Sequence, residues 1–166
     1  MDFDSIYKTY YQELYYFAIR QNLVSAEATD TVQDVYTAFY KEIQAGKQIE
    51  NPKAWLYSSL LNSVRTRYKQ HKSRQQKNIE YASGIEVIKD TQSEYNEKER
   101  RSIVEACLST MEPGDRNLML LYHKGFSYRE ISEILQINYN SVGTCIARTT
   151  QKLTFILKSK YHELFE

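Results

Sequence analysis

Apolar side chains recur every three or four positions along the N-terminal half of the chain, the spacing that places them on one face of an α-helix. This pattern predicts three helices, near 5–22, near 26–44, and from Pro52 to about residue 78. Their apolar stripes are, in chain order, Ile6, Tyr10, Leu14 and Phe17, then Val32, Val35, Phe39 and Ile43, then Leu56, Leu60, Val64 and Tyr68. Three such stripes predict helices that pack together as one domain of about 75 residues.

Two further helices are expected near 97–111 and 113–124, after a stretch of different composition. That stretch, 80–95, places serines and a glycine among acidic residues and predicts a linker. Its apolar residues could dock elsewhere on the protein: Ile85, Val87 and Ile88.

A capped turn between two short helices is expected next. Gly125 suits the residue just past a helix end, where φ is often positive, and Ser127 with Glu130 matches a capping box. The following apolar stripe is Ile131, Ile134 and Leu135, with Ile137 filling the turn. Asn138 can then cap a second helix that reaches Leu153. This pattern predicts a helix-turn-helix whose second helix fits a DNA major groove; the alternative is a helical hairpin with no role in DNA binding.

The composition agrees with an all-α protein. The chain has only five glycines and two prolines, and Pro52 and Pro113 both stand where a helix should begin. We therefore expect two small helical domains, 1–79 and 96–166, joined by a linker at 80–95. The second domain contains the helix-turn-helix.

Membrane and metal-binding classes are not supported by the sequence. No apolar run approaches the ~18 residues that a membrane span needs, and no signal peptide opens the chain. We expect a cytoplasmic protein with no membrane insertion. Cys107 and Cys145 are isolated from each other and from the three histidines, so neither a disulfide, a metal site nor a cofactor is expected.

The net charge of +1 is segregated along the chain. Residues 1–51 carry a net charge of −4 and residues 80–115 a net charge of −5, whereas residues 116–166 carry +3. Residues 52–79 carry seven basic residues and no acid. The two basic blocks are candidates for nucleic-acid binding and the acidic N-terminal block for a basic protein surface. A merely solvated helix would account for 116–166 but not for 52–79.

The second predicted helix has a polar face opposite its apolar stripe. This face consists of Asp30, Gln33, Asp34, Thr37 and Lys41. Two carboxylates and an amide at this spacing suit bidentate contacts from arginines. Paired carboxylates also occur in acid–base catalysis, but no histidine, nucleophile or metal-ligand set is near them in sequence, so an enzyme is not expected. A plain solvated face is the remaining alternative.

The third predicted helix combines aromatic and basic residues. Its basic and amide side chains, Asn62, Arg65, Arg67 and Lys69, could neutralise phosphates and contact an unstacked base. Trp55 is expected to be a core residue rather than a stacking platform.

Three motifs occur in order along the chain: Asp30-x-x-Gln33-Asp34-Val35-Tyr36, Asn51-Pro52-Lys53-Ala54-Trp55-Leu56-Tyr57, and Gly125-x-Ser127-Tyr128-x-Glu130-Ile131. In order and spacing they resemble an extracytoplasmic-function sigma factor of bacterial RNA polymerase. The resemblance implies an N-terminal domain that binds the polymerase clamp and opens the minus-ten element. It also implies a C-terminal domain that binds the polymerase flap and recognises the minus-thirty-five element.

By position, this resemblance assigns Asp30, Gln33 and Asp34 to polymerase binding and the loop 46–51 to capture of a flipped minus-ten base. Asn62 would lie beside that base. The strand-backbone contacts would be Arg65, Arg67 and Lys69. Promoter melting would be driven by binding, because capture of the base offsets the few kcal/mol of unstacking. No covalent chemistry is required of this chain.

The second helix of the helix-turn-helix, which we call the recognition helix, departs from the family pattern. Here Gly143, Cys145 and Thr150 stand where a lysine and two arginines are usual. The remaining phosphate contacts are expected at Arg129, Arg148 and Lys152. The base-edge contacts are expected at Tyr139, Asn140 and Thr144.

The resemblance implies three partners: core RNA polymerase, promoter DNA and an anti-sigma factor. The main alternative is a stand-alone helix-turn-helix DNA-binding transcriptional regulator, which would account for 113–153 but leave the acidic face and the basic helix without a role. An RNA-binding or scaffolding helical protein would account for the charge blocks but not for the capped turn.

Overall fold

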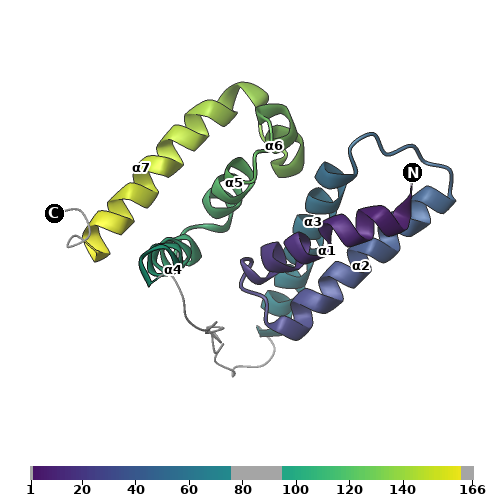
Figure 1. Ribbon diagram of the computed structural model, residues 1–166, viewed down its shortest axis with the longest axis horizontal. Helices are drawn as coiled ribbons and strands as arrows, with labels where there is room; N and C mark the ends of the chain where they lie inside the picture. The colour runs from purple at the N-terminus through teal and green to yellow at the C-terminus, as the bar shows by residue number, and fades with distance from the viewer. Residues whose placement is uncertain (1, 76–94, 162–166) are drawn as a thin grey trace. The chain divides into compact units, whose positions relative to one another are not determined.

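The computed structural model describes residues 2–75 and 95–161 (Figure 1). The chain divides into two compact units, Met1–Val87 and Ile88–Glu166. Within the described residues the regular elements are all helices and none is a strand. The predicted all-α fold class is therefore confirmed.

Some predictions fall outside the described residues. These are the linker at 80–95 apart from Tyr95, the docking of Ile85, Val87 and Ile88, and residues 76–78 of the third predicted helix. The domain boundaries at 79 and 96 therefore stay predictions.

Three helices form the first unit: α1 (Phe3–Ile19), α2 (Ser25–Gln44) and α3 (Pro52–Gln75). Each of them contacts the other two. The buried core includes Leu14, Phe17, Val32, Val35, Phe39, Leu56, Leu60 and Val64. All of these belong to the predicted stripes, so the predicted packing of three amphipathic helices is confirmed. Ile6, Tyr10 and Ile43 are half-buried at the edge of this core.

Tyr68 departs from the predicted stripe, because 45% of its surface is exposed. Its hydroxyl donates a hydrogen bond of 2.6 Å to the carbonyl oxygen of Gln21, in the turn after α1. A tyrosine places its polar tip against an acceptor while its ring covers apolar surface. This bond holds the side chain at the surface rather than in the core.

The first helix begins and ends earlier than predicted. It begins at Phe3 because the Asp2 carboxylate caps it, accepting hydrogen bonds from the backbone N–H groups of Asp4 and Ser5 at 3.2 and 3.3 Å. It ends at Ile19, and Asn22 then has a φ of +61°, a left-handed conformation that cannot continue a helix.

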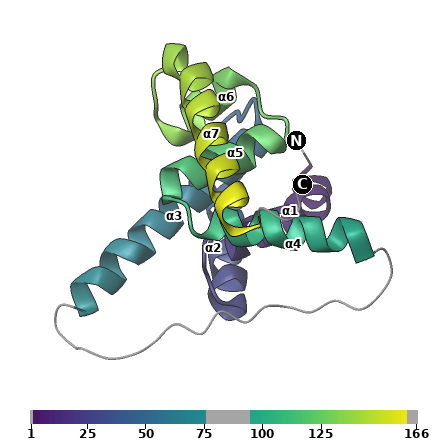
Figure 2. The same cartoon turned by 90° about the vertical axis from the view of Figure 1, so that its left-hand side faces the viewer.

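The second unit consists of α4 (Tyr95–Ser109), α5 (Pro113–His123), α6 (Tyr128–Leu135), the 3₁₀ turn η1 (Tyr139–Ser141) and α7 (Val142–Lys160). Helix α7 contacts α4, α5 and α6. It passes α6 at its first turns and α4 at its last turns (Figure 1 and Figure 2). The core of this unit includes Cys107, Met111, Leu118, Leu121, Ile131, Ile134, Val142 and Ile146.

The predicted helix-turn-helix is present in α6, η1 and α7. Gly125 has a φ of +79°, as expected past a helix end. The Glu130 N–H donates to Ser127 Oγ at 3.3 Å and the Ser127 N–H donates to the Glu130 carboxylate at 2.8 Å, which confirms the capping box. The stripe Ile131, Ile134 and Leu135 is buried, and Ile137 in the turn is half-buried.

The second helix of this motif differs from the prediction at both ends. The Asn138 side chain accepts a hydrogen bond of 2.9 Å from the Asn140 N–H, but the turn that it caps is the 3₁₀ turn η1. Helix α7 then continues to Lys160 rather than ending at Leu153. Neither glycine nor proline occurs over 154–160, so the chain contains no helix terminator there.

None of the described helices is both long and apolar enough to cross a membrane. The described ranges also contain no group of three histidine, cysteine, aspartate or glutamate side chains placed to hold a metal ion. Cys107 is buried and Cys145 is half-buried, each as a free thiol.

Candidate functional site

The predicted polar face of α2 is exposed in the structure. Asp30, Gln33, Asp34, Thr37 and Lys41 are all accessible to solvent. The buried residues of the same helix occupy the opposite face. The accessibility of this face is therefore confirmed, while its role in binding polymerase stays a prediction.

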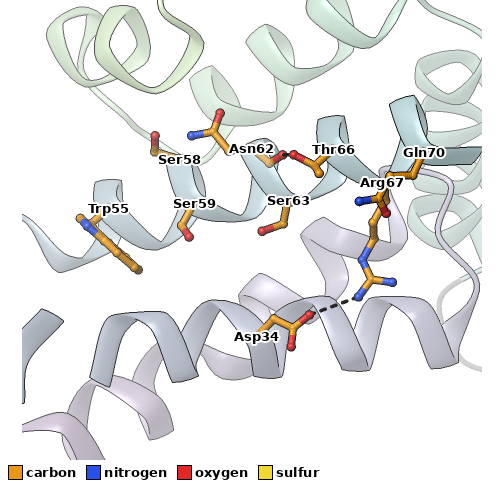
Figure 3. Close-up of a pocket in the computed structure, with 9 residues that line it drawn as sticks. All are labelled: Asp34, Trp55, Ser58, Ser59, Asn62, Ser63, Thr66, Arg67 and Gln70. Carbon is orange, nitrogen blue, oxygen red and sulfur yellow. Dashed lines mark hydrogen bonds and ion pairs between the residues drawn. The ribbon is translucent and has the colours of Figure 1, made fainter. Parts of the chain in front are cut away.

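A groove of about 660 Å³ lies between this face and α3. It is lined by Asp34, Trp55, Ser58, Ser59, Asn62, Ser63, Thr66, Arg67 and Gln70. Ser59 and Ser63 point from α3 toward α2, and Trp55 stands nearer the start of α3 (Figure 3). Hydroxyl, amide and guanidinium groups around an open groove can donate hydrogen bonds to phosphates or to base edges.

An ion pair crosses this groove. The guanidinium Nη2 of Arg67, on α3, lies 3.3 Å from Oδ2 of Asp34, on α2 (Figure 3). The family resemblance implied that Asp34 contacts polymerase and that Arg67 contacts the DNA strand. The structure brings these two predicted contacts into one pair, which the sequence did not indicate.

The other predicted strand contacts lie along α3. Arg65 donates from Nη1 to the side-chain oxygen of Asn62 over 3.3 Å, and both side chains are exposed. Lys69 is also exposed, one turn further along the helix. The structure therefore places Asn62 in the groove, Arg65 against Asn62, and Lys69 on the exposed surface beyond.

Trp55 is half-buried and forms part of both the core and the groove. One part of it packs against Phe39, with ring centroids 5.2 Å apart. The prediction that Trp55 serves the core is thus correct for its contact with Phe39, but the side chain also lines the groove.

The loop 46–51 is anchored at both ends. Gly46 has a φ of +79°, the left-handed conformation that lets the chain leave α2. Ile49 is buried, and the Asn51 side chain accepts a hydrogen bond of 3.0 Å from the Ala54 N–H, which caps α3. A loop held at these points can present its remaining residues in a defined conformation.

The predicted base-edge contacts lie on the exposed side of η1 and of the first turn of α7. Asn140 and Thr144 are exposed, and Tyr139 has 57% of its surface accessible. The opposite side is buried through Val142 and Ile146. A buried face and an accessible face are thus separated along α7. Leu153 is only half-buried.

The predicted phosphate contacts differ in their surroundings. Arg148 is exposed. Arg129 lies 3.3 Å from Glu133 in a largely exposed pair. Lys152 is bound to Asp115 on α5, with Nζ and Oδ2 2.5 Å apart. The role of all three in phosphate binding stays a prediction, and only Lys152 has its ammonium bound to another helix of the same unit.

Asp115 and Thr149 were not identified from the sequence. Thr149 is fully buried and donates from Oγ1 to Asp115 Oδ1 over 3.1 Å. The hydrogen bond from Lys152, followed by that from Thr149, lowers the pKa of Asp115 below its ordinary value of 3.8, although partial burial opposes the shift. An acid in the first turn after Pro113 was the available signal, because carboxylates are favoured at helix N-termini.

A second groove, of about 480 Å³, lies between the start of α5 and α7. Its lining includes Met111, Ile156 and Phe155. Phe155 is 73% exposed, the highest value among the large apolar side chains of the described residues. This apolar surface was not predicted from the sequence, because the second helix of the helix-turn-helix was expected to end at Leu153.

Comparison with known proteins gives matches over both units. The family model of sigma-70 region 2 matches residues 6–74, and the model of sigma-70 region 4 matches residues 101–153. None of the curated protein sequences compared with the chain matches it.

Two solved structures are similar to the chain over most of its length. One is the sigma factor RpoE in complex with the anti-sigma factor NepR from Bartonella quintana, with a TM-score of 0.78, 19% identity, and coverage of 96% of this chain and 98% of that one. The other is CnrH in complex with the cytosolic domain of CnrY, with a TM-score of 0.67, 19% identity, and coverage of 95% and 88%. At this identity the two likenesses show a shared fold.

Proposed function

Because the chain belongs to the sigma-70 family, as an extracytoplasmic-function sigma factor built from regions 2 and 4, we propose that three of its surfaces act in transcription initiation. These surfaces are the α2 face, the α2–α3 groove and the recognition helix, and each binds a different partner or DNA element. The observation that supports this most directly is that the two family models fall on different units. The region 2 match contains the acidic face and the groove, and the region 4 match contains the helix-turn-helix.

The exposed face of α2 binds core RNA polymerase in this proposal. Asp30, Gln33 and Asp34 present two carboxylates and an amide to solvent, a set that suits bidentate contacts from arginines of a basic partner. The polymerase clamp is the partner that the family resemblance implies for this face.

The groove and the loop 46–51 bind the melted minus-ten strand. The loop captures an unstacked base, and Asn62 contacts it from the groove. Arg65, Arg67 and Lys69 bind the strand backbone as cations. Opening then needs no covalent step, because the free energy of capturing the base and the phosphates offsets the cost of unstacking.

The second unit recognises duplex DNA at the minus-thirty-five element. Asn140, in the 3₁₀ turn η1, and Thr144, in the first turn of α7, contact base edges, with Tyr139 beside Asn140. Arg148 and Arg129 contact phosphates. The apolar groove around Phe155 is the surface that we assign to the polymerase flap, because an exposed aromatic ring beside the buried Met111 and the half-buried Ile156 suits a protein contact.

We assign two further properties to the chain on the same grounds. It acts in the cytoplasm, where core polymerase and the promoter are, and it contributes binding rather than catalysis. It is also held inactive by an anti-sigma factor; the similar sigma factor RpoE was solved with the anti-sigma factor NepR, and CnrH with the cytosolic domain of CnrY.

Reconstitution with core polymerase tests this function. The purified chain should form a complex with core RNA polymerase and direct transcription from a subset of promoters that core polymerase alone does not use. A stand-alone regulator would instead bind duplex DNA tightly by itself and fail to copurify with core polymerase. That second result would overturn the proposal.

A further inference from the structure

Among the described residues that line the groove, Arg67 is the only cation. It extends from α3 to α2, where it pairs with Asp34 (Figure 3). The side chain of Arg67 is only 28% exposed, whereas that of Asp34 is 73% exposed. The guanidinium is therefore held in the groove, while the carboxylate that holds it remains open to a second protein.

We infer that Asp34 holds Arg67 away from single-stranded DNA in the free protein, and that polymerase binding to Asp34 releases Arg67 to the strand. The inference rests on the proposed function, in which Asp34 binds polymerase and Arg67 binds the minus-ten backbone. It adds a coupling between these two contacts, so that the factor binds the strand fully only after it has bound polymerase.

The physical basis is competition for one carboxylate. A bidentate arginine from a partner occupies both oxygens of a carboxylate, and Oδ2 of Asp34 is the oxygen that Arg67 contacts. Once that oxygen is occupied, the guanidinium of Arg67 lies beside Asn62, Ser63 and Thr66 without its acidic partner. A phosphate of the strand is then the available anion for it.

The strength of such a pair sets the size of the effect. Ion pairs between solvent-exposed side chains are weak, so the release of Arg67 should change strand affinity by about two- to fivefold rather than by orders of magnitude. A change of this size is enough to favour binding to polymerase before binding to the strand.

Arg65 provides a matched control on the same helix. It also carries a guanidinium two residues before Arg67, but its bond is to Asn62 within α3 rather than to α2. A change at Asp34 should therefore alter the contribution of Arg67 and leave that of Arg65 as it was.

The test is a double-mutant cycle on the full chain without polymerase. Binding of a fluorescein-labelled 12-nucleotide single strand of mixed sequence is measured for wild type, Asp34→Asn, Arg67→Ala and the double variant at 50 and 150 mM salt. We expect Asp34→Asn to bind about two- to fivefold more tightly than wild type. We also expect Arg67→Ala to weaken binding more in the Asp34→Asn background than in the wild type. In Asp34→Asn the fall of log affinity with log salt should become steeper by roughly 0.7, the value of one added phosphate contact on a single strand.

Two controls separate this coupling from a general charge effect. Asp30→Asn removes the same charge from an exposed residue one turn earlier on α2, and its effect should be equal with and without Arg67→Ala. Arg65→Ala should weaken binding equally with and without Asp34→Asn.

The contrary results are distinct. If Arg67→Ala weakens strand binding equally in both backgrounds, Arg67 contacts the strand as proposed but Asp34 does not restrain it, and the inference is wrong. If Arg67→Ala has no effect in either background, Arg67 is not a strand contact, and both the inference and that part of the proposed function are wrong.

Discussion

Lys152 of the recognition helix binds Asp115 in the first turn of α5, with Nζ and Oδ2 2.5 Å apart. The same carboxylate accepts a hydrogen bond from the buried Thr149, one turn earlier on α7. Both oxygens of Asp115 are thus bound by α7, and the carboxylate fixes the position of the recognition helix against α5. Its contribution should be measurable both as stability and as a dependence on pH.

Replacing Asp115 with asparagine should destabilise the second unit. The variant loses the charge that Lys152 and Thr149 contact, and hydrogen bonds to charged groups contribute about 1.5–3 kcal/mol. Because Lys152 remains half exposed and can be hydrated, we expect the free energy of unfolding to fall by an amount near the lower end of this range, about 1.5 kcal/mol. Urea denaturation of the full chain at pH 7 measures it. Glu133→Gln is the control, since it breaks the exposed pair with Arg129 and should cost less than about 0.5 kcal/mol.

The same variant should show a defined pH dependence. The pKa of Asp115 is lower in the folded protein than its ordinary value of 3.8, chiefly because of the hydrogen bond from Lys152. A lowered carboxyl pKa stabilises the folded state fully above the ordinary value, and this stabilisation is lost as the pH falls through the folded value. The difference in free energy of unfolding between wild type and Asp115→Asn should therefore be constant from pH 5 to 7 and shrink below about pH 4. An equal difference at pH 3 and pH 7 would contradict the assignment.

Reversing the charge of Asp34 should weaken polymerase binding. Asp34→Lys places a cation against the basic partner proposed for this face, and like charges at a close contact cost several kcal/mol. We expect the Kd for core polymerase to rise at least about tenfold. Loss of the exposed pair with Arg67 should lower the free energy of unfolding by less than about 1 kcal/mol. Fluorescence anisotropy with labelled protein measures the Kd. The control Asp4→Lys reverses an exposed charge on α1, and equal binding by Asp34→Lys and Asp4→Lys would refute the contact.

The groove residues should affect promoter opening in two distinguishable ways. Arg65→Ala and Arg67→Ala each remove a phosphate contact, so holoenzyme should open all its promoters less well. The fall of log affinity with log salt should become shallower by roughly 0.7 in each variant. Asn62→Ala should impair only promoters that carry the preferred flipped base, because an amide contacts base edges rather than charge. Permanganate footprinting on two promoters that differ at this base measures both effects. Normal opening by all three variants would mean that the strand does not follow this groove.

The recognition helix should separate affinity from specificity. Asn140→Ala and Thr144→Ala should each weaken binding to the preferred minus-thirty-five duplex by about 1–3 kcal/mol of binding free energy. Each should also relax the preference at one base pair. Gly143→Lys with Cys145→Arg should raise affinity for any duplex and steepen its salt dependence. The new side chain at 143 must pass the Tyr128 ring, which lies 3.4 Å from the position of its Cβ but is partly exposed and can shift. Binding to wild-type and scrambled duplexes at two salt concentrations measures these effects; full discrimination by both alanine variants would place the base contacts elsewhere.

Much of the fold was determined by short-range patterns in the sequence. The capping box of Ser127 and Glu130 joins residues three apart, and Gly125 and Asn51 act within one turn of their own helices. Periodic spacing likewise determined which face of each helix is buried, as the core positions of α1, α2 and α3 show. Such signals depend on neighbours at three or four positions, so they can be identified without knowledge of the rest of the chain.

The tertiary structure alone decided which exposed and buried polar groups meet. Arg67 and Asp34 are 33 residues apart in sequence, and Lys152 and Asp115 are 37 apart. Periodicity places each of these side chains on a helix face, but the packing of two helices decides which side chain lies opposite it. The sequence could therefore assign Asp34 and Arg67 to separate partners, while the packing of α2 against α3 made them partners of each other. Thr149 was missed for the same reason, since a polar residue enters a core only where another helix supplies its hydrogen bond.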